Sequence, residues 1–203
     1  MEGIDTVLFD LGNVLIRWDP RNLYRKLFGT DTRAMEHFLE HVCSAEWNHA
    51  LDAGRPFAEA IPELQHRHPE YAEHIAAWRG RWPEMLGGAI EGTVDLLEEL
   101  RGRGHRLYAL SNWSSETFPH ARSTFPFLAW FEHIVISGDV GLAKPDPAIF
   151  ELAVRHCRLD PARTLFVDDL ERNVATARAV GMQATRFTGP AQFREELERY
   201  GLL

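Results

Sequence analysis

The chain has 203 residues, enough for one ordinary domain or for a core domain that carries a smaller insertion, and enough to bury a sizeable hydrophobic core. Its formal net charge is −8, which argues against a nucleic-acid-binding surface because such a surface needs a dense cationic face. The sequence shows no signal peptide and no apolar run long enough to span a bilayer. We therefore expect a cytoplasmic protein whose partners include no nucleic acid and no membrane.

Apolar runs typical of buried strands occur at residues 4–9, 106–111, 132–137, 164–167 and 183–187. Helical patterns lie between the later runs, at residues 94–105, 146–157 and 171–182. Asp146 and Pro147 are typical of a helix start, and Gly181 is typical of a helix end. Strands that alternate with helices in this way predict an α/β fold, a Rossmann-like parallel sheet with helices on both faces.

The connection after the first predicted strand is much longer than an ordinary loop. It contains amphipathic helical patterns at residues 22–28, 34–51, 56–68 and 71–82, separated by stretches that contain glycine or proline. We therefore predict a small helical cap domain, residues 18–91, inserted into a core formed by residues 1–17 and 92–203.

Charged and polar residues stand where the predicted strands end, which is where parallel sheets bind ligands. These residues are Asp10, Ser111, Asn112, Lys144 (just before the helix at 146), Asp168 and Asp169. Three acids brought together repel one another unless a cation neutralises them, and oxygen ligands favour Mg²⁺. Lys144 is also one of only two lysines in the chain, so its ammonium is an unusual choice for this sequence.

Four segments, VLFDLGNVL, ALSNWS, GLAKPDPAIF and LFVDDLERN, resemble in order and spacing the four signature motifs of the haloacid dehalogenase superfamily, whose members are mostly phosphatases. The DLGNV form of the first motif is similar to that of bacterial sugar-phosphate phosphatases. The resemblance implies a Mg²⁺-dependent hydrolase that cleaves a small phosphorylated metabolite, a sugar phosphate among the candidates, through an aspartyl-phosphate. We expect a monomer or a homodimer.

The resemblance also implies a role for each matching residue. Asp10 would be the nucleophile, and Lys144 and Ser111 would assist it by holding phosphate oxygens. The metal ligands would be Asp10, the backbone carbonyl of Gly12, Asp169 and, less directly, Asp168. The substrate-binding residues would be Asn13, Ser111, Asn112, Trp113 and Lys144.

Gly12 departs from the family pattern, because most family phosphatases have an aspartate there that protonates the leaving oxygen. General acid–base catalysis is typically worth about 10²- to 10⁴-fold, so it must come from elsewhere or be lost. Without a donor, the rate should depend steeply on the pKa of the leaving group.

Four acidic or basic residues could replace this missing acid, namely Asp19, Glu46, His49 and Asp52. Asp19 precedes Pro20 and is more typical of a helix N-cap. Glu46 and His49 have the spacing of a surface pair on one helix face. Cap residues could nevertheless reach the site, because a cap closes over it.

Two other functions compete with the phosphatase interpretation. A 2-haloacid dehalogenase uses the same aspartate without a metal, but the Asp168–Asp169 pair argues against it because dehalogenases typically have serines there. A non-catalytic phosphate-binding module is suggested by Gly12, but Asp10, Lys144 and Asp169 together argue against that alternative.

Overall fold

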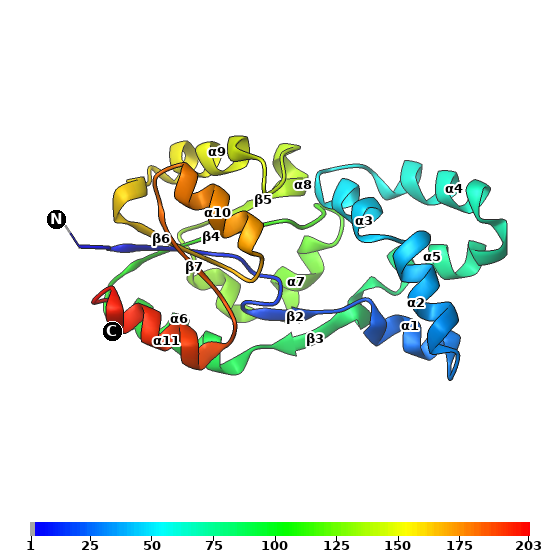
Figure 1. Ribbon diagram of the computed structural model, residues 1–203, viewed down its shortest axis with the longest axis horizontal. Coiled ribbons are helices and arrows are strands. Elements are labelled where there is room, and N and C mark those ends of the chain that lie inside the picture. Colours follow the sequence, from blue (N-terminus) through cyan, green and yellow to red (C-terminus); the bar gives the residue numbers. More distant parts are fainter. Residues whose placement is uncertain (1–2) are drawn as a thin grey trace.

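The computed structural model describes residues 3–203, which form a sheet-containing core and a helical lobe beside it (Figure 1). The core sheet has five parallel strands in the order β5-β4-β1-β6-β7. Their bounds are β1 (Thr6–Phe9), β4 (Arg106–Ser111), β5 (His133–Ile136), β6 (Thr164–Asp168) and β7 (Gln183–Arg186). The predicted α/β fold and all five predicted strands are confirmed, and β1 lies at the centre of the sheet.

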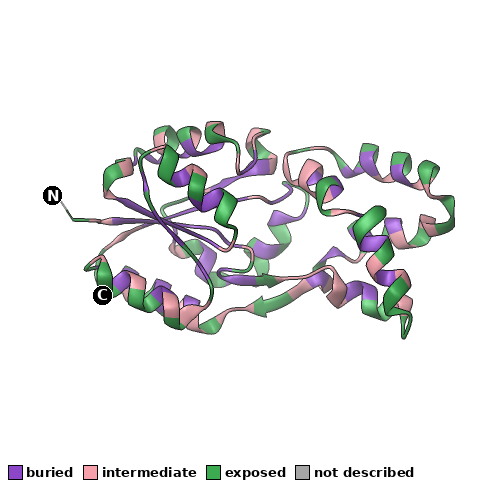
Figure 2. Ribbon diagram, viewed as in Figure 1, coloured by how far each residue is buried: buried purple, intermediate pink, exposed green. Residues whose placement is uncertain are grey.

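Helices cover both faces of this sheet. One face packs against α6 (Glu91–Gly102), α7 (Phe118–Thr124) and α11 (Pro190–Arg199), and the other against α9 (Pro147–Cys157) and α10 (Glu171–Ala179). Alternate residues of β1 pack on the two faces of the sheet, because successive side chains of a strand point in opposite directions. Val7 and Phe9 belong to one apolar cluster and Leu8 to the other. Figure 2 shows the resulting pattern of buried strands and half-buried helices.

The local signals for helix ends are confirmed at two places. The Asp146 carboxylate accepts a hydrogen bond from the Ala148 N–H and caps α9. Gly181 follows α10 with a φ of 93°, a left-handed conformation that favours glycine. The sequence pattern did not predict α7, α11 or the short α8 (Ser137–Val140).

The inserted lobe contains five α-helices within residues 21–80, which we call the helical insert: α1 (Arg21–Phe28), α2 (Thr32–His41), α3 (Ala45–Asp52), α4 (Phe57–Arg67) and α5 (Ala72–Gly80). The interpretation of residues 34–51 as one helical segment was wrong. The chain breaks after α2 because Ser44 starts a new helix, where its hydroxyl accepts the Trp47 N–H.

The two connections between core and helical insert form a short antiparallel ribbon of β2 (Ile16–Trp18) and β3 (Leu86–Ala89), which the sequence did not reveal. The expectation that Asp19 is the N-cap of α1 is off by one residue: Pro20 occupies the N-cap position, and the Asp19 side chain accepts the Arg21 N–H. The division into a core and a cap domain at residues 18 and 91 stays a prediction.

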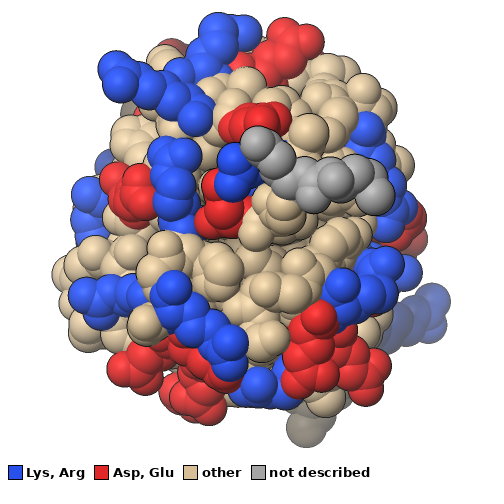
Figure 3. Space-filling view, turned by 90° about the vertical axis from the view of Figure 1, so that its left-hand side faces the viewer, with Lys and Arg blue, Asp and Glu red and all other residues tan. Residues whose placement is uncertain are grey.

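At the end of the core where β1 begins, acidic and basic side chains are interspersed on the face shown in Figure 3. Among residues 3–203, none of the helices combines the length and the apolar character needed to cross a membrane.

Candidate active site

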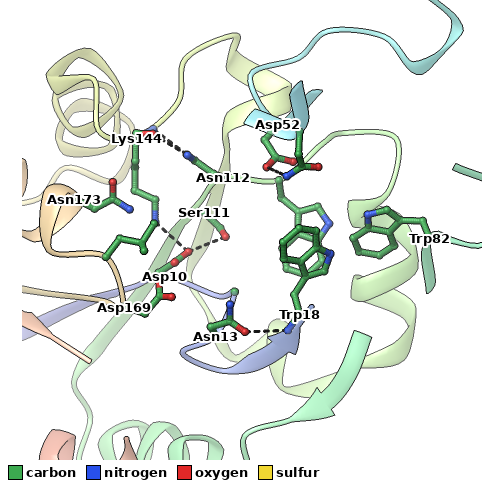
Figure 4. Close-up of a pocket in the computed structure, with 14 residues that line it drawn as sticks. Asp10, Asn13, Trp18, Asp52, Trp82, Ser111, Asn112, Lys144, Asp169 and Asn173 are labelled. Carbon is green, nitrogen blue, oxygen red and sulfur yellow. Dashed lines mark hydrogen bonds and ion pairs between the residues drawn. The ribbon is translucent and has the colours of Figure 1, made fainter. Parts of the chain in front are cut away.

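A cavity of about 230 Å³ lies between the carboxyl ends of the core strands and the helical insert (Figure 4). Core residues that line it are Asp10, Gly12, Asn13, Ser111, Asn112, Trp113, Lys144, Asp169, Leu170 and Asn173. Trp18, Trp82, Asn48 and Asp52 complete the wall from the ribbon and the helical insert. Every residue predicted for the site therefore lines this cavity except Asp168, which is fully buried and pairs with Lys144.

Asp10 directly follows the central strand and is 8% exposed. Its Oδ1 accepts hydrogen bonds from the Leu11 N–H at 2.7 Å and from the Ser111 hydroxyl at 2.8 Å, and it lies 3.0 Å from Lys144 Nζ. Burial raises the pKa of Asp10, Asp168 raises it further, and Lys144 opposes the shift. The carboxylate is thus held rigidly at the floor of the cavity, where little water can reach it to stabilise its charge.

Lys144 is 1% exposed, and its ammonium connects two of the acids. Nζ lies 2.6 Å from Asp168 Oδ2 in addition to its contact with Asp10. Asn112 fixes the backbone of this lysine, because its amide donates to the Lys144 carbonyl and accepts the Lys144 N–H, both at 2.8 Å. Burial alone would lower the pKa of Lys144, but the two carboxylates raise it, so the group stays charged.

The two acids after β6 have different environments. Asp168 is fully buried and accepts hydrogen bonds from Lys144, the Leu170 N–H and the Asn173 amide. Asp169 is partly exposed to the cavity, and burial together with Asp168 raises the pKa of its carboxyl. The Asp168 carboxylate is therefore occupied by hydrogen bonds inside the protein, whereas Asp169 faces the space where a ligand would bind.

Asp10, Asp168 and Asp169 each place a carboxylate oxygen within 4.8 Å of the others. Beside them, Asn173 Oδ1 is buried and has no hydrogen-bond partner among the described residues. Clustered carboxylates whose pKa values are raised, together with an unpaired oxygen, fit a hard divalent cation that takes oxygen ligands.

Gly12 and Asn13 form the turn after Asp10. A Cβ added to Gly12 would meet no atom within 4 Å, so the position is open to the cavity rather than restricted by packing. Asn13 adopts a φ of 55°, a left-handed conformation that asparagine tolerates, and its side chain accepts the Trp18 N–H at 3.0 Å. The turn directs the chain from the floor of the cavity into the ribbon.

Three tryptophans form the apolar part of the wall. Trp113 follows β4, Trp18 ends β2, and Trp82 lies just before β3, with its ring 5.6 Å from that of Trp113. The sequence motifs implied a substrate contact for Trp113 but gave no signal for Trp82. Trp47 does not line the cavity and packs inside the helical insert against Trp78.

The helical insert places one carboxyl in the cavity, that of Asp52 at the end of α3. Glu46 is exposed, and neither Glu46 nor His49 lines the cavity. Asp19 lies outside it as well. Of the four residues considered as substitutes for an acid at Gly12, Asp52 is the one that reaches the site, and its spacing from Asn48, another cavity residue, is that of neighbours on one helix face.

The arrangement of the motifs on this fold agrees with comparisons to known proteins. Residues 4–181 match the family model described as haloacid dehalogenase-like hydrolase. The chain belongs to this family. It is therefore a hydrolase, as the sequence motifs implied.

Several relatives of known activity cover most of the chain. A sesquiterpene phosphatase, astK, of Aspergillus oryzae is 28% identical over 89% of this chain and 88% of its own length. A D-ribitol-5-phosphate phosphatase of Bacteroides thetaiotaomicron is 25% identical over 96% of this chain and 97% of its own. A haloacid dehalogenase family enzyme of the same bacterium, solved with magnesium and inorganic phosphate, has a TM-score of 0.69 and 26% identity, with 92% of this chain and 96% of that one covered.

Proposed function

We propose that this hydrolase is a magnesium-dependent phosphatase that cleaves a small phosphomonoester through an aspartyl-phosphate intermediate on Asp10. The observation that carries the proposal is the cluster of Asp10, Asp168 and Asp169 carboxylates, within 4.8 Å of one another, around the buried ammonium of Lys144. Acids held so close need a cation to become fully ionised at neutral pH.

Asp10 is the nucleophile in this proposal, because its carboxylate is fixed at the cavity floor by three contacts to its Oδ1 atom. Attack by its carboxylate oxygen on phosphorus would displace the alcohol, and water would then cleave the acyl-phosphate. Lys144 and Ser111 lie beside that oxygen, where they can bind phosphoryl oxygens and reduce the repulsion between two anions. Asn112 positions Lys144 through two hydrogen bonds to its backbone.

Asp10, Asp169 and the Gly12 carbonyl would hold Mg²⁺, with Asp168 contributing less directly. When bound, the cation would neutralise charge on both the nucleophile and the phosphate. Asp168 is already committed to Lys144, Leu170 and Asn173, which supports its less direct role. Asn173 Oδ1 remains free, among the described residues, to accept a hydrogen bond from the hydration shell of the cation.

The shape and lining of the cavity support a small substrate. Its volume is about 230 Å³, and its outer wall combines the faces of Trp18, Trp82 and Trp113 with the polar groups of Asn48 and Asp52. Apolar surfaces with a few fixed polar groups are typical of sites for small organic ligands. A sugar or polyol phosphate is the substrate class that we favour, and Asn13 and Trp113 would contact it beside the phosphate.

The test is hydrolysis of p-nitrophenyl phosphate with and without Mg²⁺, together with rapid-quench trapping of phosphoenzyme. We expect Mg²⁺-dependent turnover and a labelled Asp10, and an Asp10→Asn variant that folds normally but turns over at least about 10⁴-fold more slowly. Asn keeps the size and acceptor oxygen of Asp10 but cannot form an acyl-phosphate.

The same assay separates the alternatives. Metal-independent release of halide from a 2-haloacid, without phosphatase activity, would indicate a dehalogenase. Phosphate binding without turnover of any phosphomonoester would indicate a binding module. Full activity of Asp10→Asn would overturn the aspartyl-phosphate mechanism.

A further inference from the structure

The family's usual proton donor is replaced by Gly12, so the protonation of the leaving oxygen needs another group. In an in-line displacement, the nucleophile and the leaving oxygen lie on opposite sides of the transferred phosphoryl group. Asp10 is at the floor of the cavity, on the core side. A carboxyl across the cavity from Asp10, on the side of the helical insert, is therefore well placed to give a proton to the leaving oxygen.

Asp52 lies at that side (Figure 4). It is the last residue of α3, where Asn48, one turn earlier, donates a hydrogen bond from its amide to Asp52 Oδ2 at 2.9 Å. The backbone carbonyl of Asp52 accepts a hydrogen bond from the Ser137 hydroxyl, and that hydroxyl also accepts the Trp113 N–H at 2.8 Å. A contact within the helical insert thus orients the Asp52 carboxyl, and a contact from the core fixes the backbone of the same residue.

The core packs closely at this junction. A Cβ added to Gly138, next to Ser137, would lie 2.4 Å from the Ser115 backbone nitrogen, so a side chain at this position would force the strand-end loops apart. Gly54, two residues after Asp52, would bring a Cβ within 3.3 Å of the Gly138 carbonyl oxygen. The end of α3 therefore rests directly on the loops that surround the phosphate site, which keeps Asp52 over the cavity.

We propose that Asp52 is the general acid–base residue of this enzyme and takes the role of the acid that is missing at Gly12. In the first step, a carboxylate oxygen of Asp10 bonds to phosphorus, the bond from phosphorus to the leaving oxygen breaks, and the Asp52 carboxyl gives its proton to that oxygen. In the second step, water attacks phosphorus from the same side, its proton passes to the Asp52 carboxylate, and the bond from phosphorus to Asp10 breaks. The inference rests on the proposed phosphatase function.

The protonation state of Asp52 suits both steps. Burial between α3 and the core raises the pKa of Asp52 from 3.8 to about 7, the Ser114 backbone and Asn48 partly oppose this shift, and the charge of Asp10 adds to it. A group with a pKa near the working pH can both donate and accept a proton. Asp52 also lies outside the carboxylate group that fits a cation, so its proton is not displaced by a direct metal contact.

Other titratable groups on the surrounding elements are engaged elsewhere or do not act on this carboxyl. Glu116, after β4, accepts the Phe57 N–H and pairs with Arg79. Asp139 on α8 is exposed, and His49 on α3 does not line the cavity. Asp10 is the charged residue that contributes to the pKa of Asp52.

The experiment measures single-turnover rates, with Mg²⁺, for aryl and alkyl phosphates of graded leaving-group pKa. For the unmodified protein we expect a shallow dependence on leaving-group pKa. For Asp52→Asn, alkyl phosphates should react about 10²- to 10⁴-fold more slowly, while aryl phosphates with good leaving groups lose little in the first step. Glu46→Gln, on the same helix but outside the cavity, is the matched control and should behave as wild type.

The pH profile provides a second readout that a structural role would not change. In the unmodified protein, kcat/KM for alkyl phosphates should fall as pH rises through about 7, because Asp52 loses the proton that it must donate. This alkaline limb should be absent in Asp52→Asn. Should Asp52→Asn fail to fold in a circular-dichroism test, Asp52→Ser, which is smaller and also lacks the acid, carries the same measurements.

Two results would overturn the inference while leaving the phosphatase assignment intact. One is a loss of rate in the Asp52 variant that is equal for all leaving groups. The other is a rate that depends steeply on leaving-group pKa in the unmodified protein and equally steeply in the variant. Absence of any phosphatase activity or of a phosphorylated Asp10 in the unmodified protein would instead reject the proposed function, and the inference with it.

Discussion

The two sides of the cavity are built by different means. On the core side, charged groups fix one another: Lys144 lies 3.0 Å from Asp10 and 2.6 Å from Asp168, and the lysine and Asp168 are almost or fully inaccessible. On the opposite side, the wall combines Trp18 and Trp82 with Asn48 and Asp52, and Asp52 is held by an amide and by backbone contacts rather than by a cation. Burial raises the pKa of both the Asp10 and the Asp52 carboxyl, but the charges that add to this effect differ. Asp168 and Asp169 act on Asp10, and Asp10 acts on Asp52.

This difference separates two tasks. In the proposed function, the core side would bind the phosphoryl group, which is the same in every phosphomonoester, and its charge network would tolerate little variation. The opposite side would contact the rest of the substrate, and its side chains could vary without disturbing the charge network. The difference is tested by changes that should affect one side and spare the other.

The largest effect is expected from Lys144→Met, compared with Lys26→Met as control. Removal of the Lys144 ammonium leaves Asp10 and Asp168 buried without their cation, which should cost about 3–5 kcal/mol of unfolding free energy. Lys26 pairs with Glu84 at the surface, and its loss should leave stability near wild type. Urea denaturation measures both, and equal stability of the two variants would contradict a structural role for the charge network.

The next effect distinguishes the two neighbouring acids. Asp169→Asn should weaken Mg²⁺ binding more strongly than Asp168→Asn, because Asp169 faces the cavity. Asp168→Asn should instead lower thermal stability more, because it breaks a fully buried ion pair with Lys144. Calorimetric titration with Mg²⁺ and thermal unfolding provide the two rankings, and a reversed order in the titration would exchange the proposed roles.

A rescue at Gly12 sharpens the comparison further. An added side chain at this position meets no atom within 4 Å, so Gly12→Asp should fit and supply an acid from the core side. In the Asp52→Asn background it should recover about 10-fold or more of the lost alkyl phosphatase rate. Gly12→Asn is the matched control, and equal recovery by Asn would show that the effect is not proton transfer.

The smallest effect concerns stability and pH. The pKa of Asp52 is raised from 3.8 to about 7 in the folded state, so the folded protein binds this proton more tightly than the unfolded chain does. Its contribution to stability is therefore complete below about pH 4 and is lost as pH rises through about 7. Asp52→Asn should remove this loss. The melting temperature of the variant should therefore rise relative to that of the wild type as the pH increases from 4 to 8. A difference that does not change with pH would contradict the raised pKa.

Several features could be predicted from the sequence because their signals are local. The alternation of apolar runs and helical patterns was enough for the parallel sheet, and Asp146 and Gly181 marked helix ends through their own backbone interactions. The strand-end acids could be grouped because parallel strands end at one edge of the sheet. Asp10, Asp168 and Asp169 were expected together for that reason and lie together.

Other features depended on contacts between distant parts of the chain. The hydrogen bonds from Asn112 to the Lys144 backbone, the entry of Trp82 into the cavity wall and the different environments of Asp168 and Asp169 are set by how loops from separate strands pack. No periodicity or motif encodes these contacts. The same applies to Asp52, whose carboxyl is one of several acidic side chains in the sequence of the helical insert.

The sequence by itself therefore determined the type of fold and the chemistry of the core side, because strand order and strand-end residues carry that information. The tertiary structure decided which residue of the helical insert faces Asp10. Helical spacing relates Asn48 to Asp52 and Glu46 to His49 equally well, but it does not say which face of α3 turns toward the core. That choice follows from the packing of the end of α3 on Ser137 and Gly138, which holds the half-buried Asp52 carboxyl at the cavity, where burial raises its pKa.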